Sequence, residues 1–399
     1  MDARERSLIK RNIPKLYIYA FFQFFLVLIP VIVPFWQSKG LTLSEIFLLQ
    51  GIFGAVLILM DMPAGYFADI FGRKKAMVFG SLITGAGFQI LWFGQTFWDF
   101  AIYEIILGVG LSLQSGCDVA LLYNSMEKLE APGRKAGVLG RQRAAGTFGE
   151  GIASLLGGFL AGYALEYPAY ANALVAWAPF LVALTIHEPK GQALGRGSHR
   201  ENLLLIGRSL FKHSRLLRLV IISHIFYGFA TYCAIWAFQP YWKSRGLDIT
   251  MFGYLWAMNM FMIAAVSRSA HVIEEKLGSV AVVLLIALLP VLGYLGMGLN
   301  GGLLGVLFGM AFPMTRGLSA VIFQDAINTR VPAEIRATTN AIGNLGVRAL
   351  FIVFGPLIGH VLETKGPEHL MIVLGLIYAA GFFAVALPLL RERKSFQIV

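Results

Sequence analysis

Charged residues are scarce in this sequence. Only 14% of its 399 residues are Asp, Glu, Lys or Arg, whereas 57% are hydrophobic, and the mean hydropathy is +0.70. A soluble protein carries roughly a quarter charged residues. The charges are too few to solvate the surface of a large soluble globule. The composition therefore predicts an integral membrane protein whose outer surface faces lipid.

Cysteine and the common catalytic motifs are nearly absent. Cys117 and Cys233 each lie inside an apolar run, which predicts packing residues and excludes a disulfide framework or a metal site. No Gly-x4-Gly-Lys-Ser/Thr loop, His-Glu-x-x-His motif or Gly-x-Ser-x-Gly motif occurs. We therefore expect no enzyme, no cofactor, no metal and no use of ATP.

Long apolar runs are abundant. A bilayer-spanning helix needs about 20 apolar residues, and the sequence contains twelve such runs. The predicted spans are 14–36, 43–68, 76–95, 98–124, 138–163, 168–186, 217–241, 250–273, 278–298, 302–327, 336–361 and 368–390. The fold class predicted is an all-α integral membrane protein with twelve transmembrane helices in two pseudo-symmetric halves of six.

The distribution of basic residues predicts the orientation. Of the 33 Lys and Arg residues, one alternate set of connections holds only Lys39, Lys243, Arg245 and Lys365. Basic residues favour the cytoplasmic side. We therefore expect a multi-pass protein of the inner (cytoplasmic) membrane with both termini in the cytoplasm. The net charge of +11 then faces lipid headgroups and is no sign of nucleic-acid binding.

The longest connection divides the chain into two halves. The expected domains are an N-terminal six-helix bundle (1–186), a cytoplasmic linker with an amphipathic helix (187–216) and a C-terminal six-helix bundle (217–399). The halves resemble each other: Asp69-Ile-Phe-Gly72 after the second span matches Glu275-Lys-Leu-Gly278 after the eighth. A parallel repeat of six helices is the plan of a large transporter class, with its binding site between the repeats.

The loop after the second span carries a family motif. It contains Gly65, Asp69, Gly72, Arg73 and Lys74, in the pattern Gly-x3-Asp-x2-Gly-Arg-Lys. With twelve spans and the repeated halves, the whole chain resembles the major facilitator superfamily. The resemblance implies that Asp69 contacts the start of the eleventh span and latches the two halves on the cytoplasmic side. It also implies that Arg73 pairs with an acid ending the fourth span, where this chain has Asn124 and Glu127. The alternative is a basic loop that only sets the topology.

Ionisable residues inside spans are costly and mark function. They occur in the spans that the resemblance places around a central cavity, whereas spans 3, 6, 9 and 12 contain none in their cores. The candidates for proton coupling are Glu150, Asp61, Asp118 and Glu104. Glu150 and Arg348 lie at similar depths in the two halves, so we expect them to pair or exchange partners across the cavity. A static salt bridge is the alternative.

A desolvated guanidinium suits a carboxylate or phosphate group of a substrate. The candidates for substrate binding are therefore Arg316 and Arg348, joined by Tyr232, Trp236 and Gln114. Arg316 could instead be held by backbone carbonyls or by Glu104.

The function predicted is a secondary active transporter that moves a small amphiphilic organic solute by alternating access, with proton-coupled efflux as the first choice. The glycine pattern around Glu150 partly matches the fifth helix of drug–proton antiporters, but its proline is missing, and Glu104 stands where many of them have arginine. Proton-coupled uptake of an anionic or zwitterionic nutrient or lipid is the alternative, followed by an uncoupled facilitator. We expect a monomer with a small-molecule substrate, protons and membrane lipids as partners.

Overall fold

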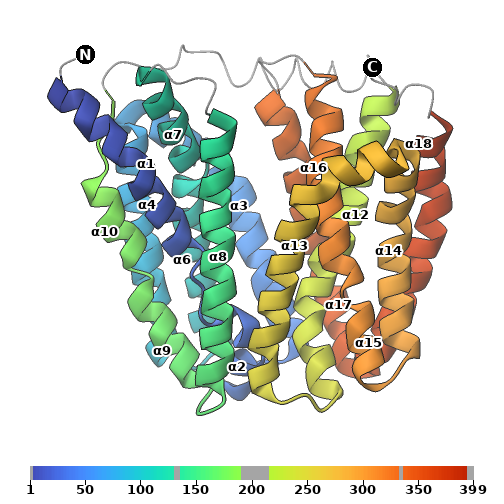
Figure 1. The fold of residues 1–399 in the computed structure, drawn as a ribbon. Helices are drawn as coiled ribbons and strands as arrows, with labels where there is room; N and C mark the ends of the chain where they lie inside the picture. The colour runs from blue at the N-terminus through green and yellow to red at the C-terminus, as the bar shows by residue number, and fades with distance from the viewer. Residues whose placement is uncertain (1–2, 130–134, 190–214, 332–335, 393–399) are drawn as a thin grey trace. The chain divides into compact units, whose positions relative to one another are not determined.

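The computed structural model describes the chain except for residues 1–2, 130–134, 190–214, 332–335 and 393–399 (Figure 1). All regular structure in the described residues is helical. The elements of the first half are α1 (Ala3–Gln23), η1 (Ile29–Val31), α2 (Ile32–Ser38), α3 (Leu43–Phe71), α4 (Arg73–Phe88), α5 (Ile90–Phe93), α6 (Phe97–Gln114), α7 (Cys117–Lys128), α8 (Lys135–Ala161), α9 (Glu166–Val175) and α10 (Ala178–Thr185).

The second half continues the all-helical pattern. Its elements are α12 (Arg215–Ser244), α13 (Ile249–Leu277), α14 (Ser279–Leu299), α15 (Gly302–Phe308), α16 (Ala311–Asn328), α17 (Arg336–Gly381), the π-helix η4 (Phe382–Ala386) and α18 (Leu387–Arg391). The expected amphipathic helix of the linker lies mostly outside the described residues.

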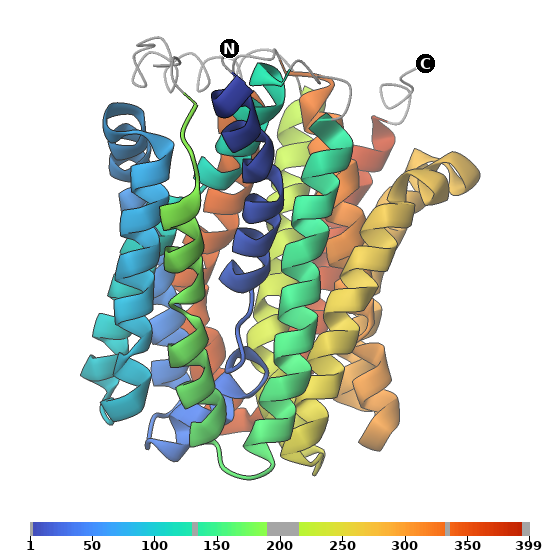
Figure 2. The ribbon, with the colours of Figure 1, turned by 60° about the vertical axis from the view of Figure 1, so that its left-hand side comes forward.

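The predicted spans are found in the structure. Within the described residues, ten helical stretches are long and apolar enough to cross a membrane. The last of them, Thr339–Arg391, joins two predicted spans at Gly366, where φ is 82°. The first predicted span is not continuous, because α1 ends at Gln23 and helical structure resumes at η1 with Pro30 (Figure 2). With the last stretch counted as two, the described residues contain eleven of the predicted spans as long apolar helices, and the first is helical but interrupted after Gln23. The predicted all-α membrane fold is confirmed.

The chain divides into two compact units by its internal contacts. Unit 1 comprises residues 1–194 and 248–261, and unit 2 comprises residues 195–247 and 262–399. Helix α13 is therefore shared: its first turns belong to unit 1 and the rest to unit 2.

In unit 1, α6 packs against α3 and α4, and α1 lies between α8 and α10 (Figures 1 and 2). Apolar side chains from α1, α4, α7 and α10 form a buried core that includes Leu16, Met77, Leu121 and Ala183. Cys117 in unit 1 and Cys233 in unit 2 are both buried, and neither forms a disulfide in the described part of the chain.

Unit 2 is built on the pairs α14–α17, α12–α17, α12–α16 and α14–α16. Aromatic rings dominate its interior. Tyr294 stacks on Tyr378 at 5.6 Å and meets Phe312 edge-on at 4.5 Å, and its hydroxyl donates to the Ala230 carbonyl at 2.6 Å. Satisfied tyrosine hydroxyls of this kind allow large side chains to be buried without an unpaired polar atom.

Candidate functional site

The motif loop forms a tight connection between α3 and α4. Gly72 has a φ of 95°, and the backbone N–H of Arg73 donates to Oε1 of Glu188 at 2.7 Å. A Cβ atom at Gly72 would lie 2.6 Å from Oε2 of Glu188, so a side chain there would displace this carboxylate as well as strain the positive φ. A carboxylate beside a helix N-terminus is stabilised by the helix dipole. The loop is therefore closed by an acid from the segment after α10, which the sequence analysis did not identify.

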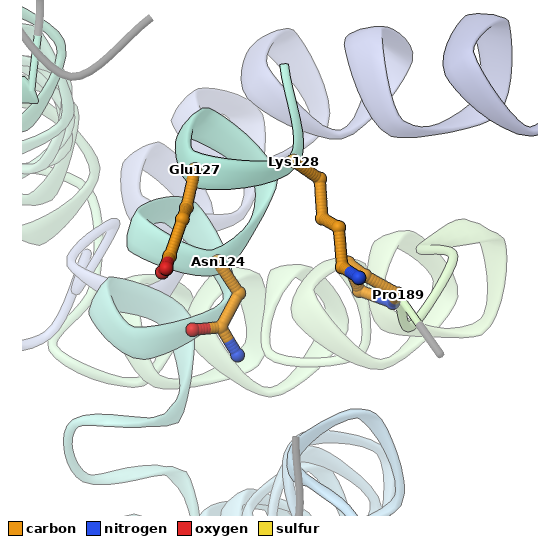
Figure 3. A pocket seen from close by; sticks show the side chains of 4 residues that line it. All are labelled: Asn124, Glu127, Lys128 and Pro189. Atoms are coloured by element: carbon orange, nitrogen blue, oxygen red, sulfur yellow. The ribbon is translucent and has the colours of Figure 1, made fainter. Parts of the chain in front are cut away.

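The predicted pairing of Arg73 with an acid at the end of the fourth span stays a prediction. No ion pair joins Arg73 to Glu127 among the described side chains. Asn124, Glu127, Lys128 and Pro189 instead line a small cavity of about 170 Å³ (Figure 3). The predicted contact of Asp69 lies between the two units, so it stays a prediction. The predicted part of Gly65 and Lys74 in the cytoplasmic latch also stays a prediction.

Gln114 lies at the centre of a buried hydrogen-bond network in unit 1. Its Oε1 accepts from the Tyr19 hydroxyl at 2.7 Å and from Nε2 of Gln23 at 3.3 Å. Its Nε2 donates to Oγ1 of Thr84 at 2.8 Å and to the Gly110 carbonyl at 3.0 Å. The amide of Gln114 is thus engaged on both sides and holds α1, α4 and α6 together. Its predicted role in substrate binding stays a prediction.

Two predicted acids in unit 1 have amide partners. Glu104 is buried in α6 and accepts a hydrogen bond from Nε2 of Gln50 at 2.7 Å. Asp118, in the first turn of α7, accepts from Nε2 of Gln142 at 2.8 Å. Both partners were missed from sequence because an amide on another helix gives no local signal. Asp61, the fourth candidate acid, is exposed on α3 two residues before Pro63.

Glu150 lies on α8 at a contact with the first turns of α13. The indole Nε1 of Trp256 donates to its Oε1 at 3.2 Å. Two glycines bring the backbones together: a Cβ atom at Gly158 would lie 2.8 Å from the Cα of Gly253, and one at Gly253 would lie 2.5 Å from the Ser154 carbonyl oxygen. The hydrogen bond of the Glu150 carboxylate and the glycine contact therefore both join α8 to α13.

The remaining candidates lie in unit 2. Arg316 on α16 is exposed and Arg348 on α17 is half-buried, and within the described part of unit 2 neither guanidinium forms an ion pair. Tyr232 meets Phe351 edge-on at 4.7 Å, and Trp236 is buried one turn further along α12. Because Glu150 and Arg348 belong to different units, their predicted pairing stays a prediction.

Taken together, the long apolar helices of the described residues, the repeat between the two halves and the ionisable side chains inside the bundles define a multi-pass membrane transporter. The family model of the Major Facilitator Superfamily matches residues 16–356. The chain belongs to this superfamily, whose members bind small-molecule substrates.

A curated relative agrees with this assignment. An uncharacterized MFS-type transporter of Methanocaldococcus jannaschii is 24% identical over 267 residues. The alignment covers 64% of this chain and 66% of the relative, slightly less than two thirds of the relative's length.

Solved structures show the same fold. A point mutant of the nucleoside transporter NupG has a TM-score of 0.80 at 16% identity, and the match covers 95% of this chain and 99% of the transporter. A bacterial homologue of the human lysosomal transporter Spinster has a TM-score of 0.73 at 17% identity, covering 98% and 99%. A D-xylose–proton symporter has a TM-score of 0.65 at 15% identity, covering 93% and 95%.

Proposed function

We propose that this protein is a proton-coupled secondary transporter for a small organic solute and that Glu150 carries the coupled proton. The observation that supports the proposal is the hydrogen bond from Trp256 to Glu150, because it joins the fifth span to the eighth, one from each sequence repeat. A protonatable group at such a place can connect proton binding to movement of one repeat against the other.

The proposed coupling follows from hydrogen-bond strength. A carboxylate accepts a stronger hydrogen bond than a neutral carboxyl group. Protonation of Glu150 would therefore weaken its hold on Trp256 and loosen the glycine contact between α8 and α13. Deprotonation would restore both, so the proton would set the balance between two arrangements of these helices.

Efflux of an amphiphilic compound is the direction we propose first. The glycines of α8 support it, because they allow α8 to contact a neighbour on each side: a Cβ atom at Gly149 would collide with the backbone of Phe21 on α1, and one at Gly158 with α13. Close approach of this kind matches the role of the antiporter-like glycine pattern.

Uptake of an anionic or zwitterionic solute is the second candidate. It is favoured by Arg316 and Arg348, two guanidinium groups inside spans without an ion-pair partner in the described part of unit 2. Such groups suit a substrate carboxylate or phosphate. An uncoupled facilitator would show neither dependence on a pH gradient nor an effect of Glu150.

The domain assignment and location belong to the same proposal. The two six-helix bundles, 1–186 and 217–399, would move about the linker 187–216, in a monomer of the inner membrane with cytoplasmic termini. Labelling of single cysteines introduced at Lys39 and at Lys75 from either side of intact cells tests the orientation. Labelling of Lys39→Cys from the cytoplasmic side would contradict it.

The test of function is flux in proteoliposomes against a panel of amphiphilic, anionic and zwitterionic compounds, with and without a pH gradient of either sign. Once a substrate is found, Glu150→Gln is expected to abolish gradient-driven accumulation but to keep substrate exchange at equal pH. Trp256→Phe keeps an aromatic side chain but removes the indole N–H that donates to Glu150, so it should shift the pH dependence of flux. Unchanged coupled transport in Glu150→Gln would overturn the role of Glu150.

A further inference from the structure

A cavity of about 480 Å³ lies in unit 2, where α13 ends, α14 begins and α16 ends. This end of the unit carries the base-rich connections and is predicted to face the cytoplasm. Small-molecule sites in proteins typically occupy about 300–1,000 Å³. The cavity is therefore large enough for an organic ligand, and nothing in the proposed transport cycle uses it.

Acidic groups outnumber basic ones around the cavity. Glu274, Glu275 and Asp325 line it together with Arg330 and His271. His271 aside, the three carboxylates and one guanidinium among the described lining residues leave a net charge of −2. Nη1 of Arg330 donates to the Ala326 carbonyl of its own helix at 2.9 Å, and the Arg330 guanidinium interacts electrostatically with Asp325, so two further carboxylates, Glu274 and Glu275, remain in excess over it.

The interior wall of the cavity is apolar. Val220, Val283, Ile322 and Phe323 line it from α12, α14 and α16, and all four are buried. A wall of this kind favours a ligand with an apolar body beside its charged group, because the cavity removes the apolar surface of the ligand from water.

The internal repeat allows the glycine beside this cavity, Gly278, to be compared with its counterpart in unit 1, Gly72. Gly72 and Gly278 both have positive φ, 95° and 81°, and each directly precedes a helix, α4 or α14. The helix after Gly72 begins with Arg73 and Lys74, whereas the helix after Gly278 begins with Ser279 and Val280. Unit 1 thus supplies its own basic side chains at a position where unit 2 has none.

The two glycines also differ in whether an acidic side chain lies against them. Glu188 approaches Gly72 so closely that a Cβ atom would meet it at 2.6 Å, whereas no atom lies within 4 Å of the Cβ position at Gly278. In unit 2, Ser279 donates its hydroxyl to Oε1 of Glu274 at 2.7 Å. The space beside Gly278 therefore stays accessible next to surplus carboxylates.

We propose that this cavity binds an organic cation, a guanidinium or primary ammonium group on an apolar body, whose charge takes the place that Arg73 has in unit 1. The carboxylates of Glu275 and Asp325 bind the cation, and the apolar wall binds the body of the ligand. The site is separate from the substrate pathway proposed above.

The test is calorimetric titration of the full-length protein in detergent with benzylguanidine and with benzylurea, a neutral compound of nearly the same shape. We expect the cation to bind at least about tenfold more tightly, because one charge-assisted hydrogen bond is worth about this factor. Glu275→Gln and Asp325→Asn should each weaken binding about tenfold. Glu5→Gln, the same change at a site in unit 1, should leave it unchanged.

Ser279→Arg provides the sharpest variant, since it introduces the base that unit 1 has at this position. It should abolish benzylguanidine binding, whereas Ser279→Ala should retain it. Glu150→Gln, which tests the transport proposal, should bind benzylguanidine like the wild type, so the two proposals fail separately. Equal binding of benzylguanidine and benzylurea, or full binding by Ser279→Arg, would overturn the site.

Discussion

Lys39 and Arg245 occupy corresponding places in the two halves and make the same two contacts. Nζ of Lys39 lies 5.6 Å from the ring centroid of Phe35 and 3.6 Å from a carboxylate oxygen of Glu166. The Arg245 guanidinium lies 4.7 Å from the centroid of its own preceding aromatic ring, Tyr241, and 3.0 Å from Oε1 of Glu368. The Lys39–Glu166 pair ties the end of the first span to the start of the sixth, and the Arg245–Glu368 pair ties the end of the seventh span to the start of the twelfth.

The sequence around these two bases repeats as well. Residues 34–41 read PFWQSKGL and residues 240–247 read PYWKSRGL, and the glycine after each base has positive φ. These bases are two of the four on the sparsely charged side. The presence of these two bases on that side has a physical reason, since each neutralises an acid within its own unit.

We expect the Arg245–Glu368 pair to contribute about 0.5–1 kcal/mol of coupling energy, because Glu368 is partly exposed to solvent and such pairs are screened. A double-mutant cycle with Arg245→Ala and Glu368→Ala, followed by reversible SDS unfolding, measures this coupling. The Lys39–Glu166 pair, with its longer separation, should couple less. A coupling energy of zero for Arg245–Glu368 would contradict the prediction.

Gly72→Ala is expected to destabilise the protein by about 1–3 kcal/mol, since it combines a strained positive φ with a collision against Glu188. Gly278→Ala is the matched control, because its φ is similar but no atom lies within 4 Å of the added Cβ. Thermal unfolding in detergent compares the two. Equal losses of stability would show that the Glu188 contact contributes nothing.

Gln114→Leu should lower the free energy of unfolding by about 1–3 kcal/mol, because it leaves the buried Tyr19 and Thr84 hydroxyls without their amide partner. Gln324→Leu, a half-buried glutamine on α16, serves as the control and should change stability little. SDS unfolding of both variants measures the difference. A Gln114→Leu protein as stable as the wild type would show that the network is dispensable.

Asp248 should make stability depend on acid pH. The Thr250 hydroxyl and backbone N–H donate to its carboxylate at the start of α13 and hold its pKa below the usual value. A lowered pKa in the folded state contributes stability above the unfolded pKa, about 3.9, and this stability is lost as pH falls through the folded pKa.

The measurement is the difference in unfolding temperature between wild type and Asp248→Ala. We expect the wild type to be more stable at pH 7 and the difference to shrink below about pH 4. Glu45→Ala, which removes another carboxylate from a helix start on the same side, gives a reference for the size of the effect. A difference that is constant down to pH 3 would exclude the carboxylate of Asp248 as its source.

The fold was predictable because its main determinant is local in sequence. A span must satisfy its backbone hydrogen bonds within itself, so about 20 consecutive apolar residues predict a helix wherever they occur. The ends of α3 and α12 agree with their predicted spans to within three residues. The break after Gln23 was missed because the apolar composition continues across it while the helix does not.

The site was less predictable because its partners come from different helices. Hydropathy and charge marked Glu104, Asp118 and Glu150 as buried or membrane-embedded acids, each from its own neighbours in sequence. The tertiary structure decided that they face Gln50, Gln142 and Trp256, and that Glu188 closes the loop at Gly72. The sequence by itself determined which residues pay a desolvation cost in lipid, since that cost depends on residue type and depth. Only packing decided which atoms offset it, because hydrogen bonds act over about 3 Å and here join residues as distant in sequence as Arg73 and Glu188, 115 positions apart.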